Sequence, residues 1–358
     1  MHAVQLTGHG GLEKLVYRDD LPVPEAGPGE VLIRVHAAGI NNTDINTRIG
    51  WYSKSITTDT ETGGTTGFDS VNNEDASWSG IPLSLPRIQG ADVCGAIVAV
   101  GEGVDPTRTG QRVLVQSIQP LRDAGPFSCI TFGSECDGGF AQFTTARSEF
   151  THAVQCDWSD AELASIPCAY STAENMLHRA NLGAERVLIT GASGGVGSAA
   201  VQLAKRRGAT VIAIAAAHKA VEVGALGADR VIDRNEALLE AFGKESVDVV
   251  VDLVAGPQWP NLLEALRRGG RYITAGAIAG PITQLDVRTL YLKDLTLFGS
   301  TCQAEEVFPN LVKYVECGEI RPTLAATYAL ADISSAQQDF LAKKYTGKLV
   351  LIPPPVIG

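Results

Sequence analysis

Residues 186–205 read RVLITGASGGVGSAAVQLAK, and the organisation of the whole chain follows from this run. Its first part, residues 187–189, is apolar and too short for a helix, so it predicts a buried parallel strand. Glycines follow at once, and after them small and apolar residues recur at helical spacing. The run therefore predicts a strand, a glycine-rich turn and a helix, and residues 210–215 predict the next strand.

The glycine-rich turn is suited to holding a pyrophosphate. Backbone N–H groups at the start of a helix attract anions, and glycines allow a phosphate to approach because they have no Cβ. The alternative is a tight turn that binds nothing. We expect a dinucleotide to contact seven consecutive residues here: Gly191, Ala192, Ser193, Gly194, Gly195, Val196 and Gly197.

Length and composition indicate a globular protein of about two domains. The chain has 358 residues, of which 45% are hydrophobic and 19% charged. The sequence contains no apolar run of membrane-spanning length and no signal-peptide pattern. The formal charge of -11 argues against nucleic acids and anionic membranes as partners. Seven cysteines without a spacing pattern are typical of a reducing compartment, so we expect a cytoplasmic protein.

The two halves of the chain differ in their predicted architecture. Short strands separated by glycine and proline predict a mainly β, barrel-like domain in the first half. From residue 158 strands alternate with helices, which predicts a doubly wound parallel α/β sheet. The last segment returns to the first style. We therefore expect residues 1–157 and 300–358 to form one domain, with residues 158–299 inserted as a dinucleotide-binding domain.

A segment of unusual composition, residues 53–86, interrupts the first half. Between residues 56 and 85 there is no Lys or Arg and there are five carboxylates. Loops of this length inside a domain are uncommon and often functional. We expect a solvated surface excursion, or else a lid over the active site or an oligomer contact that Trp51, Tyr52 and Trp78 hold in place.

Charges near the predicted adenosine site indicate which nicotinamide cofactor binds. Sites for NAD end the second strand with an acidic residue that holds the ribose hydroxyls. Here the strand is followed by alanines and Lys219, and the next strand is followed by Arg234. Cations attract a 2′-phosphate, so we predict NADP(H) bound by Lys219 and Arg234. The alternative is that Lys219 only begins a surface helix.

Five motifs resemble the medium-chain dehydrogenase/reductase superfamily, specifically its zinc-independent quinone oxidoreductase branch. The motifs are residues 39–44 with 48–52, residues 90–101, residues 192–197, residues 247–252 and residues 347–351. The resemblance covers nearly the whole chain. It implies a Rossmann domain inserted in a GroES-like catalytic domain. The acidic segment 53–86 is longer than the corresponding loop of such proteins usually is.

The resemblance also bears on metal binding. Zinc alcohol dehydrogenases of this superfamily hold a catalytic zinc with Cys, His and Cys. Asn41 and Ala91 stand at the first two positions here, and only Cys168 lies near the third. One thiolate cannot hold zinc, and Cys129 and Cys136 are too few for a structural site, so we expect no metal.

The resemblance places Asn41 and Tyr52 near the nicotinamide as candidate catalytic residues, and Thr172 and Gly276 among the cofactor contacts. The Tyr52 hydroxyl would donate to a substrate oxygen, and Asn41 would hold the substrate or the ribose. The structural alternatives are a turn residue for Asn41, a loop anchor for Tyr52 and a helix N-cap for Thr172.

These residues predict NADPH-dependent hydride transfer to a quinone or to a conjugated enone or enal, acceptors that need little acid catalysis. The alternatives of the same fold are a zinc-type alcohol dehydrogenase and an enoyl-thioester reductase; a non-catalytic NADPH-binding protein is a further one. Family members often dimerise through a sheet edge, so the strand at 295–299 predicts a homodimer.

Overall fold

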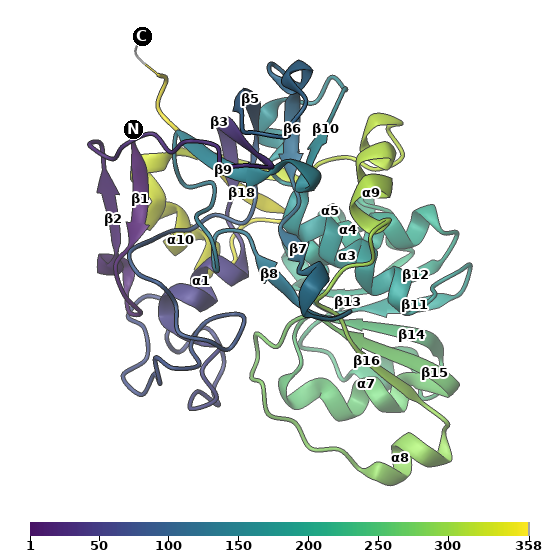
Figure 1. The fold of residues 1–358 in the computed structure, drawn as a ribbon. Coiled ribbons are helices and arrows are strands. Elements are labelled where there is room, and N and C mark those ends of the chain that lie inside the picture. The colour runs from purple at the N-terminus through teal and green to yellow at the C-terminus, as the bar shows by residue number, and fades with distance from the viewer. Residues whose placement is uncertain (357–358) are drawn as a thin grey trace.

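The computed structural model describes residues 1–356, which form two large sheets that lie side by side (Figure 1). The first is a mixed sheet of seven strands that includes strands from both ends of the chain. Along it lie β10 (Thr151–Ala153), β6 (Arg112–Val115), β5 (Cys94–Val100), β3 (Glu30–Gly39), β18 (Lys348–Ile352) and β17 (Leu324–Ala329), and β9 (Phe143–Arg147) also pairs with β3.

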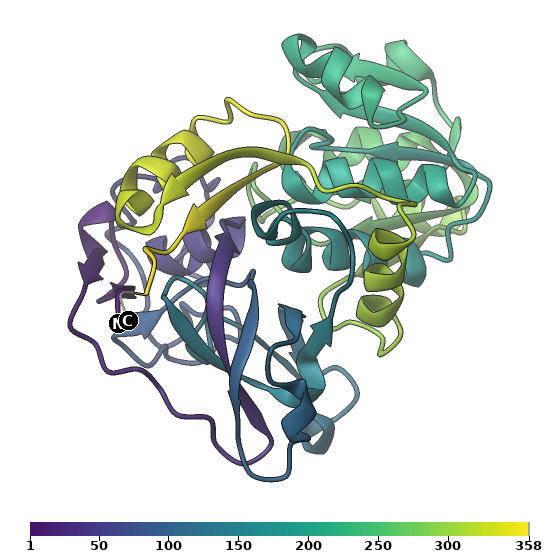
Figure 2. The same ribbon diagram turned by 90° about the horizontal axis from the view of Figure 1, so that it is seen from above.

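The end of the chain returns to the first sheet, as the sequence predicts. β18 runs antiparallel to β3 and pairs Val350 with Gly39. Figure 2 shows these C-terminal strands, in yellow, beside the purple β3. Alternate residues of β3, Val31, Ile33 and Val35, are buried, as expected for a strand with one face in the core.

Two small sheets complete this half of the molecule. The first contains β1 (Ala3–Leu6), β2 (Leu15–Arg18) and β4 (Arg87–Ile88), and the second contains β7 (Ile118–Pro120) and β8 (Cys129–Thr131). β9 begins at Phe143. Just before it, the chain packs closely at Gly139, where a Cβ would lie 2.4 Å from Val93 Cγ2.

The second sheet is the predicted doubly wound parallel sheet. Its order is β13 (Arg230–Asp233), β12 (Thr210–Ala215), β11 (Arg186–Ile189), β14 (Val247–Asp252), β15 (Leu266–Thr274) and β16 (Thr296–Gly299). All neighbouring pairs are parallel. The strand order reverses between β11 and β14, and ligands of such sheets bind at the carboxyl ends of the strands at this point.

Helices cover both faces of the parallel sheet. They and the remaining helices are α1 (Asn42–Ile49), α2 (Asp160–Leu163), α3 (Pro167–Arg179), α4 (Gly195–Arg206), α5 (Ala220–Ala225), α6 (Leu238–Phe242), α7 (Trp259–Ala265), α8 (Val287–Leu292), α9 (Val307–Glu316) and α10 (Ile333–Leu341). Val187 and Ile189 of β11 pack in the core with α3, α4 and α9, whereas Leu188 packs in a separate core with α7. Burial on both faces explains why β11 is apolar without alternation.

None of the helices in residues 1–356 is both long and apolar enough to cross a membrane.

The insert, residues 53–86, lies between α1 and β4 and contains turns and bends without a helix or strand in the described structure. In Figure 1 it forms the dark loops below α1.

Candidate active site

The glycine-rich turn lies at the crevice between β11 and β14. Gly191 has a φ of +59°, and its nearest neighbours across the crevice are Val254 and Leu253. At Gly197, a Cβ would lie 2.2 Å from the Gly191 oxygen, so only glycine lets the helix pack this close to the strand. The helix α4 begins at Gly195 and directs the N–H groups of its first turn to this end.

The predicted cofactor residues share this edge of the sheet. Residues 191–197 connect β11 to α4, and Gly276 follows β15 with its Cα close to Leu253. Thr172 lies in α3, which packs beside α4. This arrangement, with an open glycine cradle and a helix N-terminus, fits the pyrophosphate of a dinucleotide.

The adenosine end of the site contains several cations. The backbone N–H of Arg234 donates to Ala215 O at 2.9 Å, which places Arg234 beside the end of β12. Arg234 and Lys343 both line a cavity of about 270 Å³. No carboxylate follows β12, where residues 216 and 217 are alanines. Glu61 lines the same cavity, so its charged residues are two cations and one carboxylate.

Lys219 has a structural role in addition to its position near this cavity. Its Nζ donates to the backbone oxygens of Lys343 and Tyr345, each at 2.6 Å. Burial lowers the pKa of Lys219, and the nearby charge of Arg234 lowers it further. Lys219 therefore holds the segment that carries Lys343, and direct contact with a 2′-phosphate stays a prediction.

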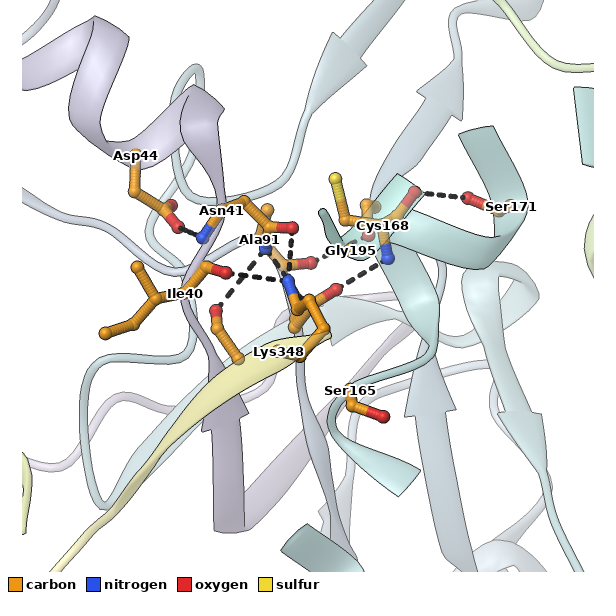
Figure 3. Close-up of polar contacts among 12 residues, drawn as sticks. Ile40, Asn41, Asp44, Ala91, Ser165, Cys168, Ser171, Gly195 and Lys348 are labelled. Atoms are coloured by element: carbon orange, nitrogen blue, oxygen red, sulfur yellow. Dashed lines mark hydrogen bonds and ion pairs between the residues drawn. The ribbon is translucent and has the colours of Figure 1, made fainter. Parts of the chain in front are cut away.

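The ammonium group of Lys348 lies in a buried polar cluster beside Ile40 and Asn41 (Figure 3). Lys348 is buried, and its Nζ donates to Ile40 O at 2.7 Å, to Asp92 Oδ2 at 2.8 Å and to Asn41 Oδ1. Its stem passes the glycine turn so closely that a Cβ on Gly195 would lie 2.7 Å from Lys348 Cδ. Gly195 thus makes room for the stem of Lys348.

Asp92 connects three segments around this lysine. Its Oδ2 also accepts from Asn41 Nδ2 at 2.8 Å, and its Oδ1 accepts from the backbone N–H of Cys168 at 2.6 Å. The remaining Asn41 N–H donates weakly to Gly39 O at 3.4 Å. Asn41 is therefore engaged on both its oxygen and its nitrogen, so the structure gives it a role in holding the site together.

The side chains of this cluster do not match the ligand set of a zinc site. Across residues 1–356, no group of three or more His, Cys, Asp or Glu side chains is arranged to hold a metal ion. The Lys348 ammonium lies between Asn41 and Asp92, where a second cation would be repelled. Zinc needs thiolate, imidazole or carboxylate ligands around an open position, and these residues do not fit it.

Tyr52 lies next to this cluster and keeps its proton. Its hydroxyl donates to Thr43 Oγ1 at 3.2 Å. Burial raises the pKa of Tyr52 to about 12, against the lowering effect of its hydrogen bonds with Thr43 and Asn46. Cys168 is near enough to raise it further. The Tyr52 hydroxyl is therefore a neutral hydrogen-bond donor throughout the physiological range.

Cys168 and Thr172 complete the surroundings of Tyr52. Burial raises the pKa of the Cys168 thiol well above its usual value, and a hydrogen bond with Thr172 opposes this shift. The thiol is thus protonated and unreactive at neutral pH. Asn41, Tyr52 and Thr172 thus lie around Asp92 and Cys168. The O–H group of Tyr52 donates to Thr43, and a catalytic role for these three residues stays a prediction.

Three residues of this cluster were not predicted as site residues. Lys348 and Asp92 lie inside motifs that the sequence analysis used only to identify a family. The sequence feature that could have pointed to Lys348 is its position at the start of an otherwise apolar strand, Lys348–Ile352. Asp44, in α1, accepts from the backbone N–H of Asn41 at 2.8 Å. Burial raises the pKa of Asp44 to about 7.

Comparisons with known families agree with this architecture. Residues 27–156 match the family described as alcohol dehydrogenase GroES-like domain, and residues 195–316 match the family described as zinc-binding dehydrogenase. The fold is thus GroES-like in its first part and Rossmann-type in its second.

Individual relatives extend over the whole chain. An acryloyl-coenzyme A reductase from Metallosphaera sedula is 29% identical, covering 98% of this chain and 99% of the relative. A quinone oxidoreductase from Rattus norvegicus is 28% identical and covers 98% of both chains. A crystal structure from Sinorhizobium meliloti, of a candidate alcohol dehydrogenase, is 46% identical, with a TM-score of 0.87 over 99% of this chain and 97% of the other. The chain therefore belongs to the medium-chain dehydrogenase/reductase superfamily of nicotinamide-dependent oxidoreductases.

Proposed function

We propose that this protein uses NADPH to reduce a quinone or a conjugated enone or enal, without zinc. The observation that carries the proposal is the buried Lys348–Asp92–Asn41 cluster, in which Asn41 and Asp92 hold an ammonium group. Arg234 and Lys343 line one cavity, and no carboxylate directly follows β12; both observations support NADPH over NADH.

The chemistry assigned to the protein is positioning and hydrogen bonding. NADPH, when bound, supplies the hydride. The Tyr52 hydroxyl, which donates to Thr43 in the structure, would turn its proton to the acceptor oxygen and stabilise the charge that develops there. Because the pKa of Tyr52 is raised to about 12, it donates a hydrogen bond without releasing a proton. Acceptors whose product anions are already stabilised, such as quinones and enones, suit such a donor.

An enoyl thioester is the second candidate acceptor, favoured by the 29% identity to an acryloyl-coenzyme A reductase. Its reacting group is a conjugated carbonyl of the same class, so the same cluster and the same Tyr52 hydroxyl would serve it.

The cytoplasmic location suggested by the cysteine pattern stays a prediction.

The test is a steady-state assay of NADPH and NADH oxidation with benzoquinones, alkenals, crotonyl-coenzyme A and simple ketones. We expect turnover with one of the conjugated acceptor classes, a preference for NADPH, and none with simple ketones. Tyr52→Phe should lower kcat for alkenals by about 10- to 100-fold, because one donor to the developing charge is lost. The loss should be smaller for quinones, which accept hydride with less help.

Tyr17→Phe is the matched control, since the Tyr17 hydroxyl contacts His2 far from the crevice and should leave kcat unchanged. Turnover of simple alcohols with added zinc would contradict the proposal. A tightly bound NADPH that is never oxidised by any acceptor would favour a non-catalytic binding protein instead.

We also propose a homodimer formed through β16, the last strand of the parallel sheet. Leu297 of this strand and Tyr291 and Leu292 of the preceding α8 are exposed large hydrophobic residues. An unpaired sheet edge with apolar neighbours favours pairing with a second copy. Light scattering should report twice the monomer mass, and Leu297→Lys should reduce it to the monomer; a wild-type monomer at micromolar concentration would refute the dimer.

A further inference from the structure

The insert is held against both halves of the molecule. From its middle, the Thr60 backbone N–H and hydroxyl both donate to Ile278 O, at 3.1 and 3.4 Å, in the loop that follows β15. On the other side, Gly64 O accepts from Arg48 Nη2 at 2.6 Å, and Thr65 O accepts from the Leu12 N–H at 3.2 Å. The insert is therefore hydrogen-bonded both to the loop after β15 and to the first half of the molecule.

Arg48 fixes the position of this bridge. Its side chain is fully buried in α1, and its other guanidinium nitrogens donate to Gly10 O and to Gln337 Oε1, each at 2.9 Å. A buried guanidinium with three acceptors has one geometry, because each lost hydrogen bond would leave a polar atom unsatisfied. Gly64 and its neighbours in the insert thus have a defined place in the fold.

That place is the cavity at the adenosine end. Glu61, Gly64 and Thr65 of the insert line the same cavity of about 270 Å³ as Arg234 and Lys343. Arg234 and Lys343 come from the parallel sheet and from the segment before β18. The cavity therefore contains two cations and one carboxylate, and the carboxylate is supplied by the insert alone.

The charge of Glu61 acts on the cations of this cavity. The Lys343 side chain is largely desolvated, which lowers its pKa; the nearby Glu61 carboxylate raises it, and Lys219 lowers it slightly. Glu61 itself is exposed, so its charge is partly screened by solvent and salt. A phosphate bound between Arg234 and Lys343 would lie close to this carboxylate and would be repelled by it.

We propose that Glu61 is a specificity-determining residue through which the insert restrains the preference for a 2′-phosphate. Resting on the proposed use of NADPH, this assignment gives the acidic insert a function at the cofactor site. Arg234 and Lys343 attract the 2′-phosphate, and Glu61 opposes it, while an unphosphorylated ribose is not repelled. The difference in affinity between NADP(H) and NAD(H) is thus smaller than Arg234 and Lys343 alone would give.

Calorimetric binding of 2′,5′-ADP and 5′-AMP tests this without any turnover. In the wild type, 2′,5′-ADP should bind more tightly than 5′-AMP. Glu61→Gln should tighten 2′,5′-ADP binding by about fivefold at low salt, with a smaller gain at 300 mM NaCl, because the repulsion is screened. The affinity for 5′-AMP should change by less than twofold.

The matched control is Glu74→Gln, which removes the same charge from the insert at an exposed position outside the cavity. It should leave both affinities unchanged. Equal binding of the two nucleotides by the wild type would overturn the NADPH preference itself. A wild type that prefers 2′,5′-ADP, with the same affinities in Glu61→Gln, would overturn the role of Glu61 and leave the proposed function standing.

Discussion

Replacing Lys348 with methionine is expected to lower the free energy of unfolding by about 3–5 kcal/mol. The substitution keeps the length of the stem but leaves the Asp92 carboxylate, which is fully buried, without its counter-ion. It also removes the donor to Ile40 O and Asn41 Oδ1. Urea unfolding at pH 7, followed by circular dichroism, measures this change.

Two further variants show whether the loss comes from the ion pair. Lys344→Met is the matched control: Lys344 pairs with Asp339 at 2.6 Å but is 59% exposed, so its loss should cost no more than about 1 kcal/mol. Combining Lys348→Met with Asp92→Asn should cost less than the sum of the two single substitutions, because the unpaired charge is removed. Additive costs, or a Lys348→Met protein as stable as the control, would show that the pair contributes nothing specific.

Asp44→Asn is expected to stabilise the protein at alkaline pH by up to about 4 kcal/mol. Burial raises the pKa of Asp44 from 3.8 to about 7 in the folded protein. Between these two pKa values the folded state holds a proton that the unfolded state has released, so stability falls as pH rises through this window. Asparagine carries no charge at any pH, and its amide oxygen can still accept from the Asn41 N–H.

The two proteins should therefore be equally stable near pH 4 and should diverge until about pH 8. Thermal unfolding across this range measures the difference. Asp105→Asn serves as the control, because Asp105 is exposed and hydrogen bonds from Thr107 lower its pKa, so its substitution should bring no gain at pH 8. Parallel stability curves for Asp44→Asn and the wild type would mean that folding does not raise the pKa of Asp44.

Local sequence patterns were sufficient to predict the parallel α/β sheet and the glycine-rich turn at the site. The glycine run after an apolar strand has one common explanation, since a positive φ at Gly191 and close packing at Gly197 both exclude a side chain. The unbroken apolar run in β11 indicated burial on both faces of that strand. The placement of Tyr52 and Asn41 near the nicotinamide came from a resemblance and stays a prediction.

Other features depended on contacts between distant residues. Lys348 meets Asp92 and Asn41 across 256 and 307 positions of sequence, and Lys219 meets the oxygens of Lys343 and Tyr345 across 124 and 126. Periodicity and local charge describe which face of an element is buried, but a hydrogen bond across the crevice depends on which segments the fold brings together. For that reason the sequence by itself determined the parallel sheet and the glycine-rich turn. Only the tertiary structure decided that a buried lysine joins Asn41 to Asp92, and that the acidic insert lines the cavity that contains Arg234 and Lys343.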